Sequence, residues 1–246
     1  MEFVYPGVSL AARGLFRALG LRLSVEGDEH VPTSGAFVLA SNHVSYLDFA
    51  LVGLAASRSR RRVRFLARHE LWRPPVVGPL MRRMRHVPVD RAAPAAAYLA
   101  ARSLLMQGEA VGVFPEAGVS TSYTVRAIMP GAVALAQATG VPLLPMAVWG
   151  PQRILTADRP LDLTRGCPVS LLVGEPMVFR HADGGIAART AMLALRLQSL
   201  LEELQRRPEH RPPSGRPAPW HPAHLGGTAP TPAEARLRES VPSAAA

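Results

Sequence analysis

Short apolar runs alternate with longer helix-like stretches along the chain from residue 21 onward. Apolar runs of strand length occur at residues 21–25, 36–40, 63–67, 86–89, 110–114, 143–149 and 169–173. Helix-like stretches lie between them at residues 45–56, 94–107, 131–139 and 186–206. This alternation is typical of an α/β fold, so we expect one domain over residues 21–206, with a largely parallel central sheet flanked by helices.

The two ends of the chain have different patterns. Residues 5–19 separate apolar side chains from Arg13 and Arg17, which predicts an amphipathic helix within residues 1–20. Such a helix fits either packing on the core or lying in a membrane interface. Residues 207–246 contain nine prolines and no periodic apolar stripe. We expect them to form a disordered tail, with at most a short helix at 232–239. Deletion of residues 210–246 should leave folding and activity largely unchanged.

Charge is unevenly distributed. The 246 residues are 48% apolar, enough for a substantial core, and the formal net charge is +10. All 28 cationic residues are arginine, which excludes a Schiff-base lysine and a Walker-A lysine. Residues 58–91 hold eleven arginines and two acids, a formal charge of +9. This stretch favours an anionic partner such as a phosphorylated substrate, acidic lipid or nucleic acid, whereas a solvated loop is an equal alternative for residues 58–62.

The sequence has no pattern typical of a signal peptide or a membrane span, so we expect the cytoplasmic side. Cys167 is the single cysteine, so no internal disulfide and no cysteine-rich zinc site can form. The first arginine, Arg13, follows the apolar start, which is the wrong order for a signal peptide. Prolines interrupt the uncharged stretch 127–152, so it is not typical of a membrane span. We expect a peripheral protein at the cytoplasmic face of the plasma membrane.

Candidate chemistry lies where predicted strands end. His43 and Asp48 follow the apolar run 36–40, and a carboxylate beside an imidazole produces a general base. Alternatively, Ser45 and Asp48 form only a capping box that starts a helix. Glu116 follows the run 110–114, and Arg68 with Glu70 follows the run 63–67. Three such strand ends predict one cleft.

These polar blocks, in order, resemble the glycerolipid acyltransferase family, the 1-acyl-glycerol-3-phosphate acyltransferases. The family's Asn-His-x-Ser-x-x-Asp block is matched in full by Asn42, His43, Ser45 and Asp48. Its second block, Phe-x-Ala-(Lys/Arg)-x-Glu-Leu, is matched by Phe65, Ala67, Arg68, Glu70 and Leu71. The segment Pro88-Val89-Asp90-Arg91 is similar to the family's segment between blocks.

The later blocks are kept in part. In Phe-Pro-Glu-Gly-Thr-Arg-Ser, the residues Ala117, Gly118 and Val119 replace Gly-Thr-Arg. The fourth block, Val-Pro-x-x-Pro, is matched by Val141, Pro142 and Pro145. Order and spacing agree over about residues 30–180, which is far more specific than any single block.

The resemblance implies a reaction without an acyl-enzyme. His43, oriented by Asp48, deprotonates an acceptor hydroxyl, which attacks the thioester of acyl-CoA or acyl-acyl carrier protein. The implied acceptor is a lysophospholipid, foremost 1-acyl-glycerol-3-phosphate. Neither a metal nor a redox cofactor is implied, and the expected partners are the acyl carrier, the lysophospholipid and an anionic membrane surface.

The resemblance also implies which residues surround the substrate. Asn42 and Ser45 belong to this set, although Ser45 is expected mainly at the helix start. Arg68 is expected to hold the acceptor phosphate together with neighbouring main-chain amides. The remaining members expected near the acceptor are Glu70, Glu116 and Gly118.

The missing third-block arginine leaves two alternatives. Because Val119 cannot bind a phosphate, Arg126, seven residues downstream, is expected to reach the same group. Otherwise the acceptor is another lysolipid or a non-glycerol hydroxyl compound.

Two other classes of protein fit the sequence less well. A serine hydrolase is disfavoured because Gly-x-Ser-x-Gly is absent. A nucleic-acid-binding protein would use the arginine-rich stretch, but the chain carries no recognition motif for one, and no nucleic acid partner is expected.

Overall fold

A seven-stranded sheet forms the centre of the computed structural model, which describes residues 4–180 and 184–238. The strand order is β1-β7-β6-β2-β5-β3-β4, and each neighbouring pair is parallel except β6 and β7, which are antiparallel. The largely parallel sheet is therefore confirmed, and every predicted strand bound is correct to within one residue. The strands are β1 (Arg22–Glu26), β2 (Phe37–Ser41), β3 (Val63–Arg68), β4 (Val87–Val89), β5 (Ala110–Val113), β6 (Leu143–Trp149) and β7 (Pro168–Val173).

The helices agree with the predicted stretches, with one addition. α2 begins at Asp48 rather than at residue 45, because residues 42–47 form a turn. α3 was not predicted, since its seven residues include Gly78 and Pro79. No helix in the described part of the chain is long and apolar enough to span a bilayer. The helices are α1 (Val4–Ala18), α2 (Asp48–Arg58), α3 (Val77–Arg83), α4 (Pro94–Met106), α5 (Gly131–Thr139), α6 (Ile186–Gln205) and α7 (Pro232–Arg238).

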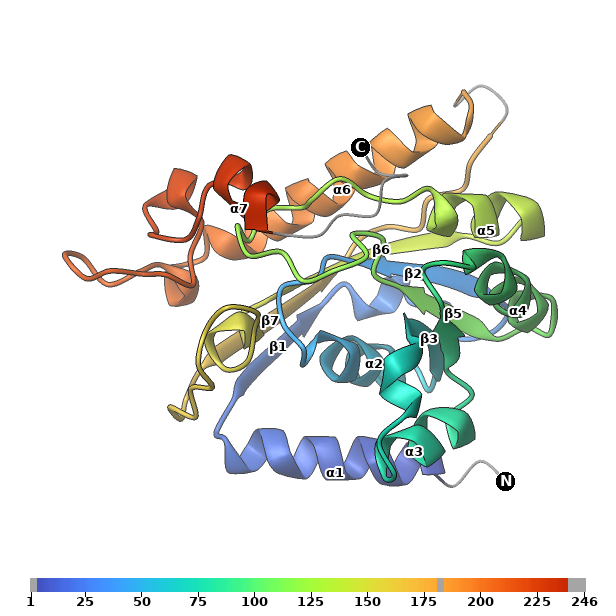
Figure 1. Cartoon of the computed structure of the whole chain (residues 1–246), viewed down its shortest axis with the longest axis horizontal. Helices are drawn as coiled ribbons and strands as arrows, with labels where there is room; N and C mark the ends of the chain where they lie inside the picture. Colours follow the sequence, from blue (N-terminus) through green and yellow to red (C-terminus); the bar gives the residue numbers. More distant parts are fainter. Residues whose placement is uncertain (1–3, 181–183, 239–246) are drawn as a thin grey trace.

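Helices cover both faces of the sheet (Figure 1). Phe37 and Leu39 of β2 pack in the core with α2 and with Phe16 of α1. Val38 and Ala40 point to the opposite face and pack with α4, α5 and α6. Because successive strand residues alternate between faces, a strand buried on both sides is apolar throughout. This explains why β2 and β6 appear in the sequence as continuous apolar runs.

Helix α1 uses only part of its surface for packing. Tyr5 and Phe16 are buried, and the Tyr5 hydroxyl lies 3.2 Å from both the main-chain N and O of Val63. Leu10 and Leu15 remain 71% and 53% exposed. The helix therefore packs on the core, and its exposed apolar face leaves the membrane-interface alternative as a prediction.

The prediction of a disordered tail is wrong for residues 207–238, because this segment packs on the domain. The His210 ring lies 2.8 Å from the hydroxyl of Ser170 in β7, and the His221 ring packs edge-on against Trp149. Lack of periodicity excludes long regular elements, but it does not exclude an irregular chain held by single anchors. Residues 239–246 lie outside the described part. Within 207–238, the buried residues are His210, Ala218, His221, Pro222, Ala229 and Ala235. The short helices are η5 (Pro208–His210), η6 (Ala223–Leu225) and α7.

His86 makes the stability of the fold pH-dependent. Its Nδ1 accepts a hydrogen bond of 3.0 Å from the Phe65 main-chain N–H, which requires an unprotonated nitrogen. Burial, helped by the charge of Arg64, lowers the His86 pKa to about 4. Because the unfolded chain binds this proton near the ordinary pKa of about 6.5, stability is complete above that pH and falls as the pH decreases toward 4.

We predict that the free energy of unfolding falls by about 2 kcal/mol between pH 7 and pH 5 through His86 alone. His86→Asn, whose amide oxygen can still accept the Phe65 N–H, should flatten this dependence. Urea denaturation at both pH values measures it, with exposed His69→Asn as the matched control. Equal pH dependence in wild type and His86→Asn would contradict the assignment.

Candidate active site

The turn between β2 and α2 brings His43 and Asp48 together. His43 Nδ1 lies 2.9 Å from Asp48 Oδ2. The same oxygen accepts the main-chain N–H groups of Val44 at 2.7 Å and Ser45 at 2.8 Å. One carboxylate oxygen therefore both orients the imidazole and holds the main chain of the turn before α2, whose N-cap residue Leu47 makes no side-chain cap bond. Burial raises the pKa of Asp48, whereas His43 and the two N–H donors oppose that shift.

The imidazole of His43 is held in one tautomer and one orientation. A carboxylate only accepts, so Nδ1 carries the proton and Nε2 retains its lone pair. Phe114, at the end of β5, stacks on the ring with a centroid distance of 4.4 Å and an interplanar angle of 23°. The His43 side chain is 20% exposed and that of Asp48 is 0% exposed. This is the arrangement of a general base that can take a proton from a hydroxyl group.

Asn42 and Ser45 face the protein interior. The Asn42 amide donates to the Val148 carbonyl at 3.0 Å and accepts the Val148 N–H at 2.8 Å, so it extends the pairing of β6. Ser45 Oγ donates to the Leu155 carbonyl at 2.5 Å and accepts the Leu47 N–H at 3.1 Å. Both side chains are buried and bonded to main chain. The geometry therefore gives them a structural role in the turn, and their expected contact with substrate stays a prediction.

Glu116 connects the first and third blocks. One carboxyl oxygen accepts the His43 N–H at 2.8 Å, and the other accepts the Arg126 N–H at 2.8 Å. A further bond of 2.7 Å runs from the Ser120 N–H to the His43 carbonyl. Burial raises the pKa of Glu116 to about 8 against the lowering by these two donors. Its side chain is only 2% exposed and fixes the turn, while the expected role in orienting the acceptor stays a prediction.

Two arginines reach residues 117–119, the turn of the third block in which Val119 replaces the family's arginine. The Arg126 guanidinium donates to the Val119 carbonyl at 3.4 Å and lies over Gly118, where an added Cβ would come within 2.8 Å of it. Arg91 donates to the Ala117 carbonyl. Burial lowers the pKa of Arg91, and the charges of Arg68 and Arg126 lower it further. Arg68 ends β3, which lies next to β5 in the sheet, at the same edge as this turn. We call Arg68, Arg91 and Arg126 the arginine rim.

Arg91 was missed as a site residue. Its sequence signals were its place in the cationic stretch 58–91 and in the Pro-Val-Asp-Arg segment at the end of β4, which carries no recognisable chemistry by itself. Ala117 is also notable, because it has a φ of 55° where the family has glycine. The altered third block thus keeps the left-handed turn at the cost of some backbone strain.

Arg68 and Glu70 lie outside the hydrogen-bonded centre. Arg68 is the last residue of β3 and is exposed. Glu70 lies in η2 (His69–Trp72), is exposed, and is 3.6 Å from the ring of His69. Because β2, β5 and β3 are adjacent and parallel, their carboxyl ends share one edge of the sheet, as expected. Within that edge the structure assigns Glu70 no contact with His43 or Glu116 among the described residues.

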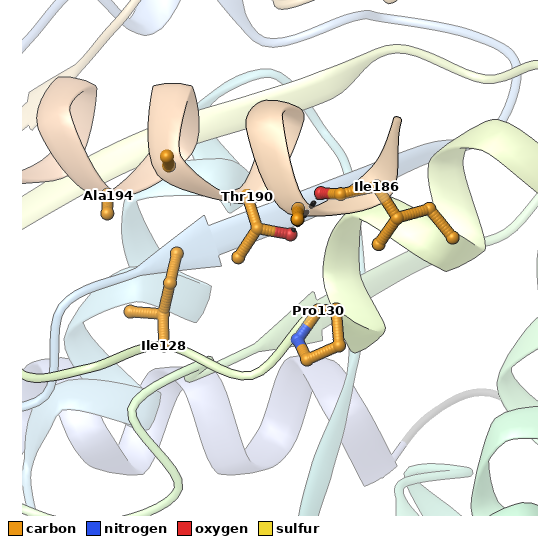
Figure 2. Close-up of a pocket in the computed structure, with 7 residues that line it drawn as sticks. Ile128, Pro130, Ile186, Thr190 and Ala194 are labelled. Carbon is orange, nitrogen blue, oxygen red and sulfur yellow. Dashed lines mark hydrogen bonds between the residues drawn. The ribbon is translucent and has the colours of Figure 1, made fainter. Parts of the chain in front are cut away.

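A separate, largely apolar groove of about 430 Å³ lies between the segment before α5 and helix α6 (Figure 2). Ile128 and Pro130 form one side, and Ile186, Thr190 and Ala194 of α6 form the other. None of the residues lining it is ionisable, so the groove is distinct from the turn that carries His43 and Asp48, which we call the catalytic turn because it holds the candidate base.

Comparison with known proteins identifies the family. Residues 22–149, more than half of the chain, match the family model described as Acyltransferase. The chain belongs to the acyltransferase family. The 1-acyl-sn-glycerol-3-phosphate acyltransferase of Bacillus subtilis (strain 168) is 30% identical over 201 residues, covering 78% of this chain and 96% of that protein. The O-acyltransferase class expected from the blocks is thereby confirmed.

Two further similarities place this acyltransferase in context. The crystal structure of the 1-acyl-sn-glycerophosphate acyltransferase PlsC from Thermotoga maritima has a TM-score of 0.70 and 26% identity, covering 82% of this chain and 80% of that one. The chloroplastic 1-acyl-sn-glycerol-3-phosphate acyltransferase BAT2 of Brassica napus is 28% identical over 167 residues. That match covers 66% of this chain and 47% of the plant protein. The α/β fold therefore agrees with that of a solved family member.

We predict that His43→Ala lowers acyl transfer by roughly 10²–10⁴-fold, because the proton acceptor is lost. Asp48→Asn keeps an oxygen for the two N–H donors but removes the charge, so its rate loss should be large and its loss of stability small. Thiol release and thermal unfolding measure the two effects, with His69→Ala as control. Wild-type turnover in folded His43→Ala would contradict a general-base role.

Proposed function

We propose that this acyltransferase moves a fatty acyl group from acyl-CoA or acyl-acyl carrier protein to the free hydroxyl of 1-acyl-glycerol-3-phosphate, giving phosphatidic acid. The observation that carries the proposal is the His43–Asp48 pair beside the arginine rim. A base and a cluster of cations suit an acceptor with a hydroxyl and a phosphate. The relatives named above act, by their names, on that acceptor class.

The reaction proceeds in two steps. Nε2 of His43 takes the proton of the acceptor hydroxyl as its oxygen attacks the thioester carbonyl. The tetrahedral intermediate then collapses, the carbon–sulfur bond breaks, and the thiolate takes the proton from the imidazolium. Asp48 stabilises the imidazolium in the interval. Ser45 is not a nucleophile, because its hydroxyl is bonded to the Leu155 carbonyl and is buried.

The arginine rim is proposed to bind the acceptor phosphate. Arg126 lies over Gly118 and reaches the Val119 carbonyl, so its charge occupies the region where the family arginine would start. This position favours compensation by Arg126 over a change of acceptor. Arg91 and Arg68 add charge at the same rim, and guanidinium groups bind phosphate through paired N–H donors.

The protein is further proposed to bind an anionic membrane surface at its cytoplasmic face. Leu10 of α1 and Val76, next to α3, are 71% and 69% exposed. Helices α1 and α3 are in contact and form one edge of the molecule (Figure 1). Arg73, Arg82 and Arg83 lie along that edge, in and just before α3. Apolar insertion and cationic attraction to anionic lipid then act together.

We predict that Arg126→Ala weakens use of lysophosphatidate by roughly tenfold or more, because a charge-assisted hydrogen bond is lost. Monoacylglycerol, which has no phosphate, should be used as by wild type. Gly118→Ala should have a smaller effect of the same kind, since its methyl displaces the guanidinium.

Initial rates of thiol release from acyl-CoA measure these effects, with the exposed Arg102→Ala as control. Equal losses on both acceptors, or a wild type that prefers monoacylglycerol, would favour the alternative of a different acceptor. A wild type that transfers no acyl group to any hydroxyl acceptor would refute the proposed function.

We predict that Leu10→Asp reduces binding to vesicles containing phosphatidylglycerol several-fold, because a charge replaces an inserting side chain. Added salt should weaken wild-type binding as well. Co-sedimentation measures both, with Leu237→Asp, at a residue 89% exposed on α7, as the matched control. Binding indifferent to anionic lipid, salt and Leu10→Asp would contradict the proposed surface.

A further inference from the structure

The catalytic turn is supported by a loop that follows β6. We call residues 150–156 the buttress loop; it contains η3 (Pro151–Arg153). Ser45 Oγ donates to the carbonyls of Leu155 at 2.5 Å and Pro151 at 3.3 Å, and the Tyr46 N–H donates to the Leu155 carbonyl at 3.3 Å. Thr156 Oγ1 donates to the Val44 carbonyl at 2.7 Å. The residues between His43 and Asp48 are therefore bonded to this loop.

The buttress loop is held in turn by the C-terminal segment. The guanidinium carbon of Arg153 lies 3.4 Å from the centroid of the Trp220 ring. Gln152 donates to the Trp220 carbonyl at 3.3 Å, and Arg153 donates to the His210 carbonyl at 3.2 Å. A buried guanidinium stacked on an indole is among the stronger cation–π arrangements. Burial lowers the pKa of Arg153 to about 10, in agreement with this enclosed position.

The segment that carries Trp220 is itself anchored to the sheet. The His210 ring lies 2.8 Å from Ser170 Oγ in β7, and both residues are buried. The His221 ring packs against Trp149, the last residue of β6, with centroids 5.9 Å apart. Trp220 is thus fixed between two anchored positions, and it contacts Gln152 and Arg153 of the buttress loop.

We propose that Trp220 is a positioning residue for acyl transfer, and that the C-terminal segment from residue 208 to residue 229 is part of the catalytic apparatus. The proposal rests on the proposed function. Trp220 holds Arg153, the buttress loop holds the turn, and the turn sets the geometry of His43 and Asp48. Displacement of a catalytic group by about 1 Å can reduce a rate by about 10²-fold, so loss of the ring affects turnover without touching substrate.

The test compares Trp220→Ala, Trp220→Phe and Leu237→Ala in the full chain. Trp220→Ala should lower kcat by about tenfold or more, with KM for acyl-CoA and acceptor unchanged, because no substrate contact is removed. Trp220→Phe retains a ring face for Arg153 and should recover most of the kcat. Leu237→Ala, at an exposed position of α7 outside that segment, should match wild type.

A second readout does not depend on activity. The His43 Nδ1–H proton shared with Asp48 should give a low-field NMR resonance, assigned by its loss in His43→Ala. Trp220→Ala should shift or broaden it, and Trp220→Phe should restore it. This measurement still tests the proposal if the wild type shows no acyl transfer, so failure of the proposed function and failure of the positioning role are distinguishable.

The proposal is overturned by a folded Trp220→Ala protein with wild-type kcat and an unchanged resonance. It is also overturned if Trp220→Phe is as impaired as Trp220→Ala, because the ring face would then not be what holds Arg153. If Trp220→Ala does not fold, Trp220→Leu keeps apolar volume without an aromatic face and replaces it in the same measurements.

Discussion

A single buried carboxylate oxygen organises the site. Oδ2 of Asp48 accepts one N–H from the imidazole of His43 and two from the main chain of Val44 and Ser45. Burial of a carboxylate is costly unless such donors surround it, so the turn must adopt the shape that delivers all three. The start of α2, the tautomer of His43 and the path of the chain between them therefore depend on one another.

Other polar side chains support this turn from several directions. Asn42 ties it to β6, Glu116 ties it to the third block, and Ser45 ties it to the loop that follows β6. Each of these bonds joins residues at least 70 positions apart in the sequence. The buried polar residues thus fix the geometry of His43, the proposed base. In the proposed function, the anionic acceptor binds to the half-exposed and exposed arginines of the rim.

The departures from the family pattern are compensated locally. With Val119 in place of the third-block arginine, Arg126 lies back over Gly118, where the absence of a side chain leaves room for its guanidinium. Arg91 reaches the same turn from the loop after β4. Positive charge is kept near the catalytic turn although it comes from different positions. The C-terminal segment is a similar case, since an irregular and proline-rich stretch supplies Trp220 to the loop beneath the turn.

The sequence by itself determined the strands and their approximate bounds. It also singled out His43 and Asp48 as a candidate pair, which the structure places 2.9 Å apart. Parallel strands buried on both faces must be apolar throughout, and a base next to its carboxylate is a local pattern, so neither needs knowledge of distant contacts. Only the tertiary structure decided that Asn42 and Glu116 bond to main-chain groups of distant segments. It also decided that Arg91 joins the rim and that residues 207–238 pack on the domain. Side-chain direction and irregular packing arise from partners far away in the chain, and composition and periodicity carry no record of those partners.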